Sequence, residues 1–376
     1  MDRIEQIAGA AVFLLGLWDV FLTVLYARAG AGIFSRAVTA GCWRIMLAMS
    51  RLAGRGRGRL LSFCGPLNLA LLVLTWSVIL ALGAGLILHP ELGRTVRPSS
   101  GPAQTDFITA LYVGGSSLSL VGASNYEPQT GPLRLLFLFN AVVGTSVISL
   151  TLTYLMQVYT ALRSRNALGL AIDTLTRETG DAAELLAAIA PEGDFSSTSL
   201  DLSDLASQMI EVKEAHHFYP VLFYFRFEQA RYSVSRFTLV ALDAVSLLRS
   251  VLDGPEARRL IASGAVEQLY RSALMLVRTL ETTFLPGAAS EAPHDEARAS
   301  AWRLRLTRAV GNLAATGLPV SSDRSASEAS YLEVRAHWDS DISRLAPALG
   351  YDIREIDTAG AGHDAEPTSG DDRRRR

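Results

Sequence analysis

The sequence predicts an all-α membrane protein, in which three transmembrane helices and a re-entrant helix and loop are followed by an all-helical cytoplasmic domain. Three observations predict this class. Residues 7–27, 67–88 and 133–158 are apolar runs of about the 20 residues that a membrane-spanning helix needs. Residues 104–130, between the last two runs, are too polar and too briefly apolar to span. Beyond residue 163 apolar residues recur at helical spacing, without a run long enough to cross a bilayer.

The first apolar run is predicted to be a spanning helix that carries a buried acid. A signal peptide is the competing interpretation, but acidic residues precede the run and the run is too long. Asp19 is an ionisable group inside this helix, which makes it a functional candidate, with a structural hydrogen bond as the alternative. Its candidate partners are Thr23, Thr75 and Ser77.

A basic loop follows the first helix and predicts the topology. Residues 28–63 hold seven arginines and no acidic residue, so the positive-inside rule places this loop in the cytoplasm. We therefore expect a multi-pass protein of the cell membrane, with its N-terminus outside and the chain after Tyr159 inside. Residues 33–52 are predicted to form an amphipathic helix along the lipid headgroups. Residues 54–59 either bind anionic lipid heads or serve as a flexible topology signal.

The short segment between the second and third spans predicts a conduction path. We expect a helix over residues 104–118, followed by an irregular stretch that opens to the outside. Irregular backbone is tolerated at membrane depth only where it is buried in protein or lines a water-filled path. Residues 91–103, before this segment, are rich in Pro, Gly and Ser and predict an exposed outer loop.

This stretch resembles the pore loop of the potassium-channel superfamily. Residues 110–112 match the pore helix, residues 119–125 the filter and residues 128–130 the exit, while Arg134 and Gly144 fall at inner-helix positions. The match from residue 110 to residue 144 needs no gap. The resemblance implies a ring of four copies, with monovalent cations, potassium first, as permeant ions. The implied selectivity filter consists of Ser119, Leu120, Val121, Gly122, Ala123 and Ser124.

Three filter residues depart from the family pattern. Leu120 stands where the family has a threonine whose hydroxyl forms the innermost ion site, and Ala123 replaces an aromatic that wedges the filter. Ser124 replaces the second glycine, and a left-handed backbone there would cost about 1–2 kcal/mol per subunit. A wider or collapsed filter is therefore the alternative to a potassium-selective one.

The third spanning helix is predicted to line the path. Thr145, Ser149, Thr153 and Gln157 recur every fourth residue and so form one polar stripe. This stripe is either a wetted pore wall or a set of interhelical hydrogen-bonding groups. Gly144 either acts as a hinge or lets two helices approach closely.

The second half of the chain is predicted to be helical throughout. Its expected helices cover residues 167–189, 202–217, 233–252, 255–284, 297–316 and 326–345. It holds no run of alternating strands and no glycine fingerprint after a strand, which excludes a cyclic-nucleotide-binding barrel and a Rossmann domain. We expect four segments: residues 1–63 with the first span and basic loop, 64–160 as the pore domain, 161–357 as the helical domain, and 358–376 as a disordered tail.

The most unusual stretch of this half is His216-His217-Phe218-Tyr219-Pro220 and the aromatic run to Phe227. Adjacent histidines point about 100° apart on a helix and no third ligand is spaced to match, so we expect no metal site. The aromatic run is expected to pack inside the domain or to form a subunit contact. The combination with a three-span half resembles an uncharacterised prokaryotic channel-like family.

The sequence predicts a homotetrameric cation channel. The alternative is a non-conducting membrane receptor or scaffold, which the residues at 120, 123 and 124 favour. An enzyme is not expected, because the chain holds no nucleophile elbow, phosphate loop or metal cluster, and its two cysteines, Cys42 and Cys64, indicate neither a disulfide framework nor a zinc site. We expect no cofactor, a lipid bilayer as surroundings, and a cytoplasmic ligand or protein as a further partner. The net charge of −2 argues against nucleic acid.

Overall fold

Helices make up most of the computed structural model, which describes residues 2–26, 32–119, 122, 124–285 and 296–358. The chain divides into two compact units. The first consists of Met1–Leu162 together with Ala215–Phe225, and the second of Arg163–Glu214 together with Arg226–Arg376. Most of the predicted tail, residues 359–376, lies outside the described residues.

Among the described residues, three helical segments are long and apolar enough to cross a membrane: Asp2–Leu25, Arg57–Glu91 and Gly131–Leu175. The first is α1 (Asp2–Val20) with a π-helical turn at Phe21–Leu25. The second contains α3 (Arg57–Ser62) and α4 (Cys64–Leu88), and the third is α6 (Gly131–Leu175). The prediction of three candidate spans is confirmed. The predicted end of the third at residue 158 is wrong, because the helix continues without a break to Leu175.

The basic loop holds the predicted helix, α2 (Ile33–Ser50), and a short 3₁₀ turn at Gly54–Gly56. One face of α2 is buried and packs against α4. The buried residues on that face are Ser35, Thr39, Cys42, Trp43, Met46 and Ser50.

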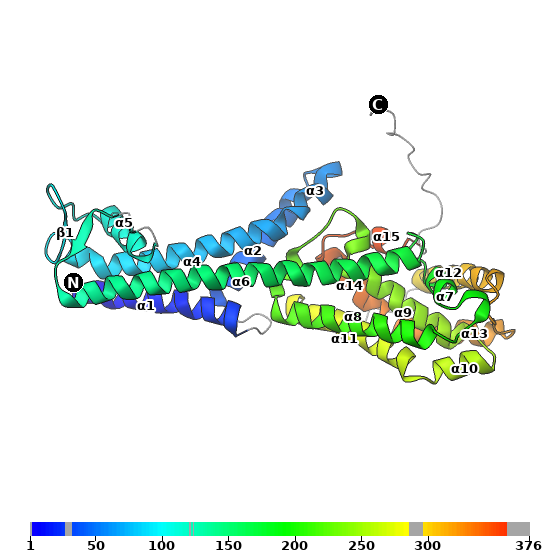
Figure 1. Cartoon of the computed structure of the whole chain (residues 1–376). Helices are drawn as coiled ribbons and strands as arrows, with labels where there is room; N and C mark the ends of the chain where they lie inside the picture. The colour runs from blue at the N-terminus through cyan, green and yellow to red at the C-terminus, as the bar shows by residue number, and fades with distance from the viewer. Residues whose placement is uncertain (1, 27–31, 120–121, 123, 286–295, 359–376) are drawn as a thin grey trace, which may run out of the picture. The chain divides into compact units, whose positions relative to one another are not determined.

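The candidate spanning helices of the first unit meet in an apolar cluster. Phe13 of α1, Leu80 and Ala84 of α4, and Leu118 form a buried cluster. Partly buried residues of α6, Val143 and Val147, pack against it. Figure 1 shows α1, α4 and α6 running side by side in this unit. This core positions the short helix that lies between α4 and α6.

Between α4 and α6 the chain forms β1 (Val96–Pro98), α5 (Phe107–Leu118) and β2 (Tyr126–Pro128). The two strands pair antiparallel, with Arg97 opposite Glu127. The expectation of an all-α protein is thus corrected, because three-residue strands are too short to show alternation in a sequence. The pairing joins the loop that precedes α5 to the chain that follows it.

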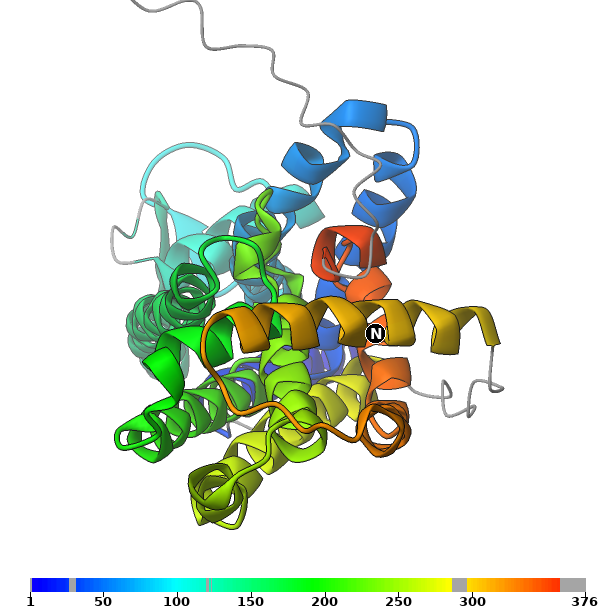
Figure 2. The ribbon, with the colours of Figure 1, turned by 90° about the vertical axis from the view of Figure 1, so that its right-hand side faces the viewer.

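The second unit surrounds one central helix, α9 (Val234–Val251), in which all residues but Arg249 are buried. Figure 2 shows α12, in gold, running from side to side in front of the other helices of this unit. The other helices are α7 (Ala182–Ile189), α8 (Thr198–Phe218, of which the unit contains the part to Glu214), α10 (Pro255–Ile261), α11 (Gly264–Phe284), α12 (Glu296–Ala315), α13 (Arg324–Ala336), α14 (Asp339–Ala348) and α15 (Ile353–Ile356).

Three of the expected helices in this half are wrong as single elements. The expected helix over residues 167–189 is broken after Leu175, because Arg177 and Glu178 adopt a left-handed backbone with φ of 50° and 66°. The stretch 255–284 is divided between Ile261 and Gly264. The stretch 326–345 is divided near Trp338. Apolar spacing alone does not mark these breaks, because it continues through them.

Candidate functional site

The candidate site begins at α5, the short helix between the second and third spans. Its 12 residues extend about 18 Å at 1.5 Å per residue, which is less than a bilayer core of about 30 Å. Asp106 caps the helix, since its carboxylate accepts from the backbone N–H of Thr109 at 3.0 Å and from its hydroxyl at 2.7 Å. The helix therefore begins at Phe107 rather than at the predicted residue 104.

The body of α5 packs closely against α4. A Cβ atom on Gly114 would lie 2.5 Å from the backbone N of Gly85, so the two backbones touch at this point. Ala110 and Val113 of α5 are fully buried with Leu88 of α4. Small residues at a helix contact allow such close approach in membranes. The contact between these two glycines could not be predicted from the sequence, because both lie in uniformly apolar runs.

The end of α5 is held against α6. A Cβ atom on Gly144 would collide with the carbonyl oxygen of Leu118. Beside this contact, the side-chain N–H of buried Asn140 donates to the hydroxyl of Ser117 at 2.9 Å. Of the two expectations for Gly144, close helix approach is the one that this geometry supports. Asn140 was not singled out from the sequence, although an amide inside an apolar run is a usable signal.

Three of the six predicted filter residues lie in the described part of the chain. Ser119 follows α5, and its backbone N–H donates to the carbonyl oxygen of Ser116 at 3.1 Å. Gly122 has a left-handed backbone with φ of 56°, which glycine adopts without strain. The hydroxyl of Ser124 accepts from the N–H of Tyr126 at 3.0 Å. Leu120, Val121 and Ala123 lie outside the described residues.

Tyr126 anchors the chain that leaves this loop. Its hydroxyl donates to the carbonyl oxygen of Gln104 at 3.0 Å and accepts from the N–H of the same residue at 2.9 Å. Tyr126 also belongs to β2. The chain before α5 and the chain after the loop are therefore fixed to each other at both the strand pair and this tyrosine.

The predicted polar stripe of α6 lies on an exposed face. Thr145, Ser149, Thr153 and Gln157 are all exposed in the single chain. The hydroxyls of Thr145 and Thr153 donate to carbonyl oxygens four residues earlier on α6, at 2.8 and 3.0 Å. The opposite face, which includes Asn140, Gly144, Thr151, Tyr154 and Val158, is buried. The stripe is thus left uncovered by the described residues of its own chain.

Asp19 is buried and joins three segments of the first unit. Its carboxylate accepts from the N–H of Phe34 at 2.8 Å, from the hydroxyl of Ser35 at 2.6 Å and from the indole N–H of Trp76 at 2.9 Å. It therefore binds the first turn of α2, where a carboxylate is favoured by the free N–H groups and the helix dipole.

The expected partners of Asp19 need correction. The hydroxyls of Thr75 and Ser77 donate to their own helix, at Leu71 and Val73. Thr23 reaches the carboxylate only through the hydroxyl of Ser35, to which it donates at 3.0 Å. The geometry supports the structural alternative for Asp19, because its bonds fasten α2 to α1 and α4.

The aromatic run after His216-His217 packs in the first unit. Tyr224 lies with its ring centroid 6.0 Å from that of Trp43, and Tyr219 lies 5.9 Å from Tyr154. Phe225 lies 6.1 Å from Tyr159 and contacts the α4 residue Gly65. The run therefore packs on α2, α4 and α6, a placement that periodicity does not predict.

An ion-pair network that sequence reasoning missed lies in the second unit, around the fully buried Asp243. Its carboxylate accepts from Arg305 and Arg335, both at 2.7 Å, and from the hydroxyl of Tyr331 at 2.6 Å. Burial opposes the charge on Asp243, but the two guanidiniums outweigh it and hold the pKa of this carboxyl below its usual value. Burial likewise opposes the charge of Arg305, whose pKa is nevertheless raised by Asp243 and Asp357.

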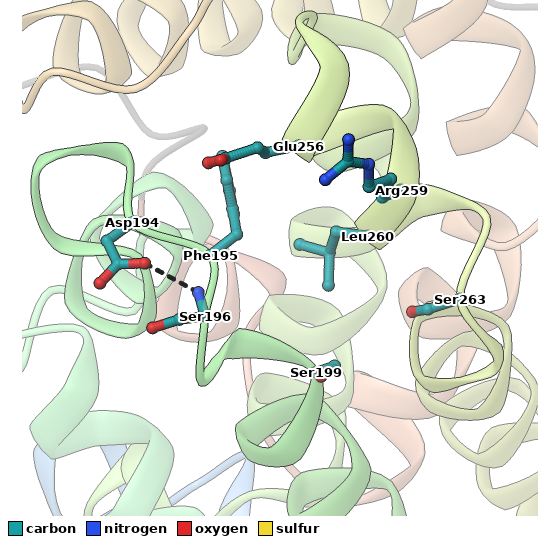
Figure 3. Close-up of a pocket in the computed structure, with 8 residues that line it drawn as sticks. All are labelled: Asp194, Phe195, Ser196, Ser199, Glu256, Arg259, Leu260 and Ser263. Atoms are coloured by element: carbon teal, nitrogen blue, oxygen red, sulfur yellow. Dashed lines mark hydrogen bonds between the residues drawn. The ribbon is translucent and has the colours of Figure 1, made fainter.

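One cavity of the second unit, of about 330 Å³, is drawn in Figure 3. Arg259 and Glu256 come from α10 and face the loop that carries Asp194 and Ser196. The carboxylate of Asp194 accepts from the N–H of Ser196 at 2.9 Å, which, with the Ser196 hydroxyl, lowers the pKa of this exposed acid. Two acids against one arginine give this cavity no surplus positive charge.

Comparisons with known proteins show a membrane protein. No protein-family model and no solved structure matches the chain. The chain is similar to the uncharacterized membrane protein YdjJ of Bacillus subtilis (strain 168), with 21% identity over 243 residues, which cover 65% of this chain and 69% of the relative. Together with the three candidate spans, this distant similarity supports a membrane protein, and it assigns no activity.

Proposed function

We propose that this chain forms a homotetrameric cation channel in the cell membrane. The observation that carries the proposal is α5, a capped 12-residue apolar helix between two candidate spanning helices, with the left-handed Gly122 four residues beyond its end. A helix too short to cross a bilayer, with the non-helical residues Ser119, Gly122 and Ser124 after it, fits a re-entrant pore element. One such element per chain requires several copies around an axis, and four match the potassium-channel arrangement.

The charges and exposed faces of the first unit support a cation path. The C-terminal end of α5 carries the negative end of the helix dipole, which favours a cation near Leu118 and the residues after it. The exposed stripe of α6 with Thr145, Ser149 and Thr153 would face the water-filled part of the path. In this proposal the β1–β2 pair lies outside the cell, and the chain after Tyr159 lies inside.

A non-conducting receptor or scaffold is the second candidate. The observation that favours it is the filter sequence, in which Leu120, Ala123 and Ser124 replace residues that form ion sites or support the filter. In that case the close packing of α5 would preserve the frame of a channel without ion flux.

Reconstitution into liposomes tests the proposal. The protein is purified in detergent, its tetrameric state is verified there, and it is then reconstituted into the liposomes. The fluxes of potassium, sodium and chloride are measured across the liposome membrane. We expect cation flux and no chloride flux. Gly122→Ala should lower the flux, because an alanine with φ near 56° is strained by about 1–2 kcal/mol. Gly101→Ala is the matched control, since Gly101 also has a positive φ, of 85°, and lies in the exposed loop before α5.

Two results would decide against the channel. An intact tetramer without flux of any ion would contradict it. Cation flux that appears only after Leu120→Thr, Ala123→Tyr and Ser124→Gly are combined would favour the non-conducting candidate. Equal flux in the wild type, Gly122→Ala and Gly101→Ala would show that Gly122 is not part of the conduction path.

A further inference from the structure

The two cysteines of the chain, Cys42 and Cys64, lie side by side in the first unit. Cys42 is on the buried face of α2, and Cys64 is the first residue of α4. Their sulfur atoms are 3.9 Å apart, although the two residues are 22 positions apart in the sequence. Both are free thiols in this structure. The packing of α2 on α4 therefore brings together two groups that no local pattern connects.

No further ligand completes this pair to a zinc site. A structural zinc ion takes four ligands, usually from cysteine, histidine or a carboxylate. Among the described residues, no group of three or more such side chains is placed to hold a metal ion. Two adjacent thiols without further ligands can instead be joined by oxidation to a disulfide.

The distance between the two sulfurs favours such a bond. A disulfide bond is about 2.05 Å long, so the sulfurs have to approach by about 1.9 Å. Each sulfur turns about its own Cα–Cβ bond between staggered positions. Rotation of the two side chains toward each other supplies a movement of this size, so the bond needs no separation of α2 from α4.

The two thiols differ in exposure and in hydrogen bonding. Cys42 is 8% exposed, whereas Cys64 is fully buried. A small uncharged oxidant such as hydrogen peroxide therefore meets Cys42 first. The side-chain N–H of buried Asn68, one turn further along α4, donates to the sulfur of Cys64 at 3.6 Å. Burial opposes the thiolate of Cys64, and this hydrogen bond offsets part of that cost.

We propose that Cys42 and Cys64 form a reversible disulfide when the protein meets a peroxide, which cross-links α2 to the start of α4. In the first step the O–O bond of the peroxide breaks, one oxygen stays on the Cys42 sulfur as a sulfenic acid, and the other leaves as water. The Cys64 sulfur then attacks the Cys42 sulfur. The S–O bond breaks, and the hydroxide leaves with the proton of the Cys64 thiol as a second water. Two thiols and one peroxide thus give one disulfide and two waters.

The disulfide holds α2 at a second point. Asp19 binds the first turn of α2 through the N–H of Phe34 and the hydroxyl of Ser35, and Cys42 lies about two turns further along the helix. In a reducing compartment such a bond is transient and reports the oxidant. The inference does not rest on the proposed channel, because a protein without ion flux can still form the bond.

Mass spectrometry of the full-length protein in detergent tests the bond. The protein is reduced with dithiothreitol, separated from it and treated with hydrogen peroxide. We expect a single chain whose mass is lower by two hydrogen atoms and which has no thiol left for iodoacetamide. After trypsin digestion, the peptides 37–44 and 60–94 should be joined to each other, since they contain the two cysteines of the chain. Dithiothreitol should restore both thiols.

Single-thiol variants test the order of the two steps. Cys64→Ser should accumulate a sulfenic acid at Cys42, which dimedone traps, because the second thiol is missing. Cys42→Ser should react with peroxide at least tenfold more slowly than Cys64→Ser, because Cys64 is fully buried. Asn68→Leu should keep the first step and slow the second, because the hydrogen bond to the Cys64 sulfur is lost.

Phe63→Cys combined with Cys64→Ser is the matched control, since it moves the second thiol by one residue to an exposed side chain. It should form the bond within one chain at least tenfold more slowly than the wild type. The proposal is overturned if peroxide leaves both wild-type thiols free or joins two chains instead of one. It is also overturned if peroxide gives sulfinic acids without a bond between the cysteines, or if the control cross-links as fast as the wild type.

Discussion

Gly144 of α6 lies directly against the carbonyl group of Leu118, the last residue of α5. No side chain fits at residue 144 without moving backbone, since the atom that it would meet is a main-chain oxygen. The bond from Asn140 to Ser117 fixes the same two helices four residues away. The end of the short helix is therefore held by shape and by a buried hydrogen bond.

We predict that Gly144→Ala destabilises the first unit. The added methyl group collides with the Leu118 carbonyl and forces α5 and α6 apart, at a cost of about 1–3 kcal/mol. Thermal unfolding in detergent, followed by circular dichroism, measures this loss. Under the proposed function, the cation flux falls as well, because the end of α5 at Leu118 is displaced.

Gly131→Ala provides the control on the same helix. A Cβ at Gly131 meets nothing within 4 Å, so this change adds a methyl group without a collision. It should leave the melting temperature unchanged or slightly higher. If both alanine variants unfold at the same temperature, the close contact at Gly144 does not exist in the protein.

We predict that Asp19→Asn loosens the attachment of α2. The carboxylate accepts three hydrogen bonds, and an amide replaces one of its two oxygens by a donor, which faces other donors. Hydrogen bonds to charged groups contribute about 1.5–3 kcal/mol, so the melting temperature should fall clearly. Asp2→Asn is the control, because Asp2 lies at the exposed start of the same helix.

A double-mutant cycle with Trp76→Phe isolates one of these bonds. Loss of the indole N–H should destabilise the wild type more than the Asp19→Asn variant, because the bond is already disturbed in that variant. Additive losses would mean that Asp19 and Trp76 do not interact.

We predict that Asp243 makes the stability of the second unit depend on pH. Its pKa in the folded protein lies below the ordinary value of 3.8, so its contribution is complete above pH 3.8 and is lost as the pH falls through the folded pKa. Asp243→Asn leaves two buried guanidiniums without this partner, at a cost of about 3–5 kcal/mol near pH 7.

The difference between variant and wild type should therefore shrink as the pH is lowered below 3.8. Chemical unfolding of the full chain, followed by tryptophan fluorescence, measures the free energy of unfolding of both proteins at each pH. Asp201→Asn, at an exposed position in α8, is the control for the substitution itself, and its loss of stability near pH 7 should be much smaller than that of Asp243→Asn. A constant difference between Asp243→Asn and wild type over the whole range would exclude the charged network.

The elements that the sequence predicted best are those whose signals are local. The three spans follow from the length and hydropathy of single runs, and α5 follows from a short apolar run between them. The hydrogen bonds of Asp19, in contrast, could not be predicted from local signals. Its donors come from residues 34, 35 and 76, so only the tertiary packing brings them together.

The helical half shows the same limit. Helical spacing located α8, α9 and α12, but the breaks near residues 262 and 337 interrupt apolar patterns that continue on both sides. The network of Asp243 joins residues 62 to 92 positions apart, and no spacing rule connects them. A charged residue on the apolar face of a predicted helix was the signal that could have singled out Asp243.

We predict that Gly65 at the start of α4 is required for the docking of Phe225. A Cβ on Gly65 would lie 2.5 Å from the Phe225 ring, which is buried and also contacts Tyr159. Gly65→Ala should lower the melting temperature, with a cost of about 1–3 kcal/mol. Combining Gly65→Ala with Phe225→Leu should recover part of the lost stability, because leucine is smaller than phenylalanine.

Gly41→Ala on α2, where a Cβ meets nothing within 4 Å, is the control. Equal losses in the single and double variants would show that Phe225 does not lie on Gly65. If the proposed channel is correct, the double variant should also conduct more than Gly65→Ala, since Phe225 lies against Tyr159 of α6, the helix proposed to line the path.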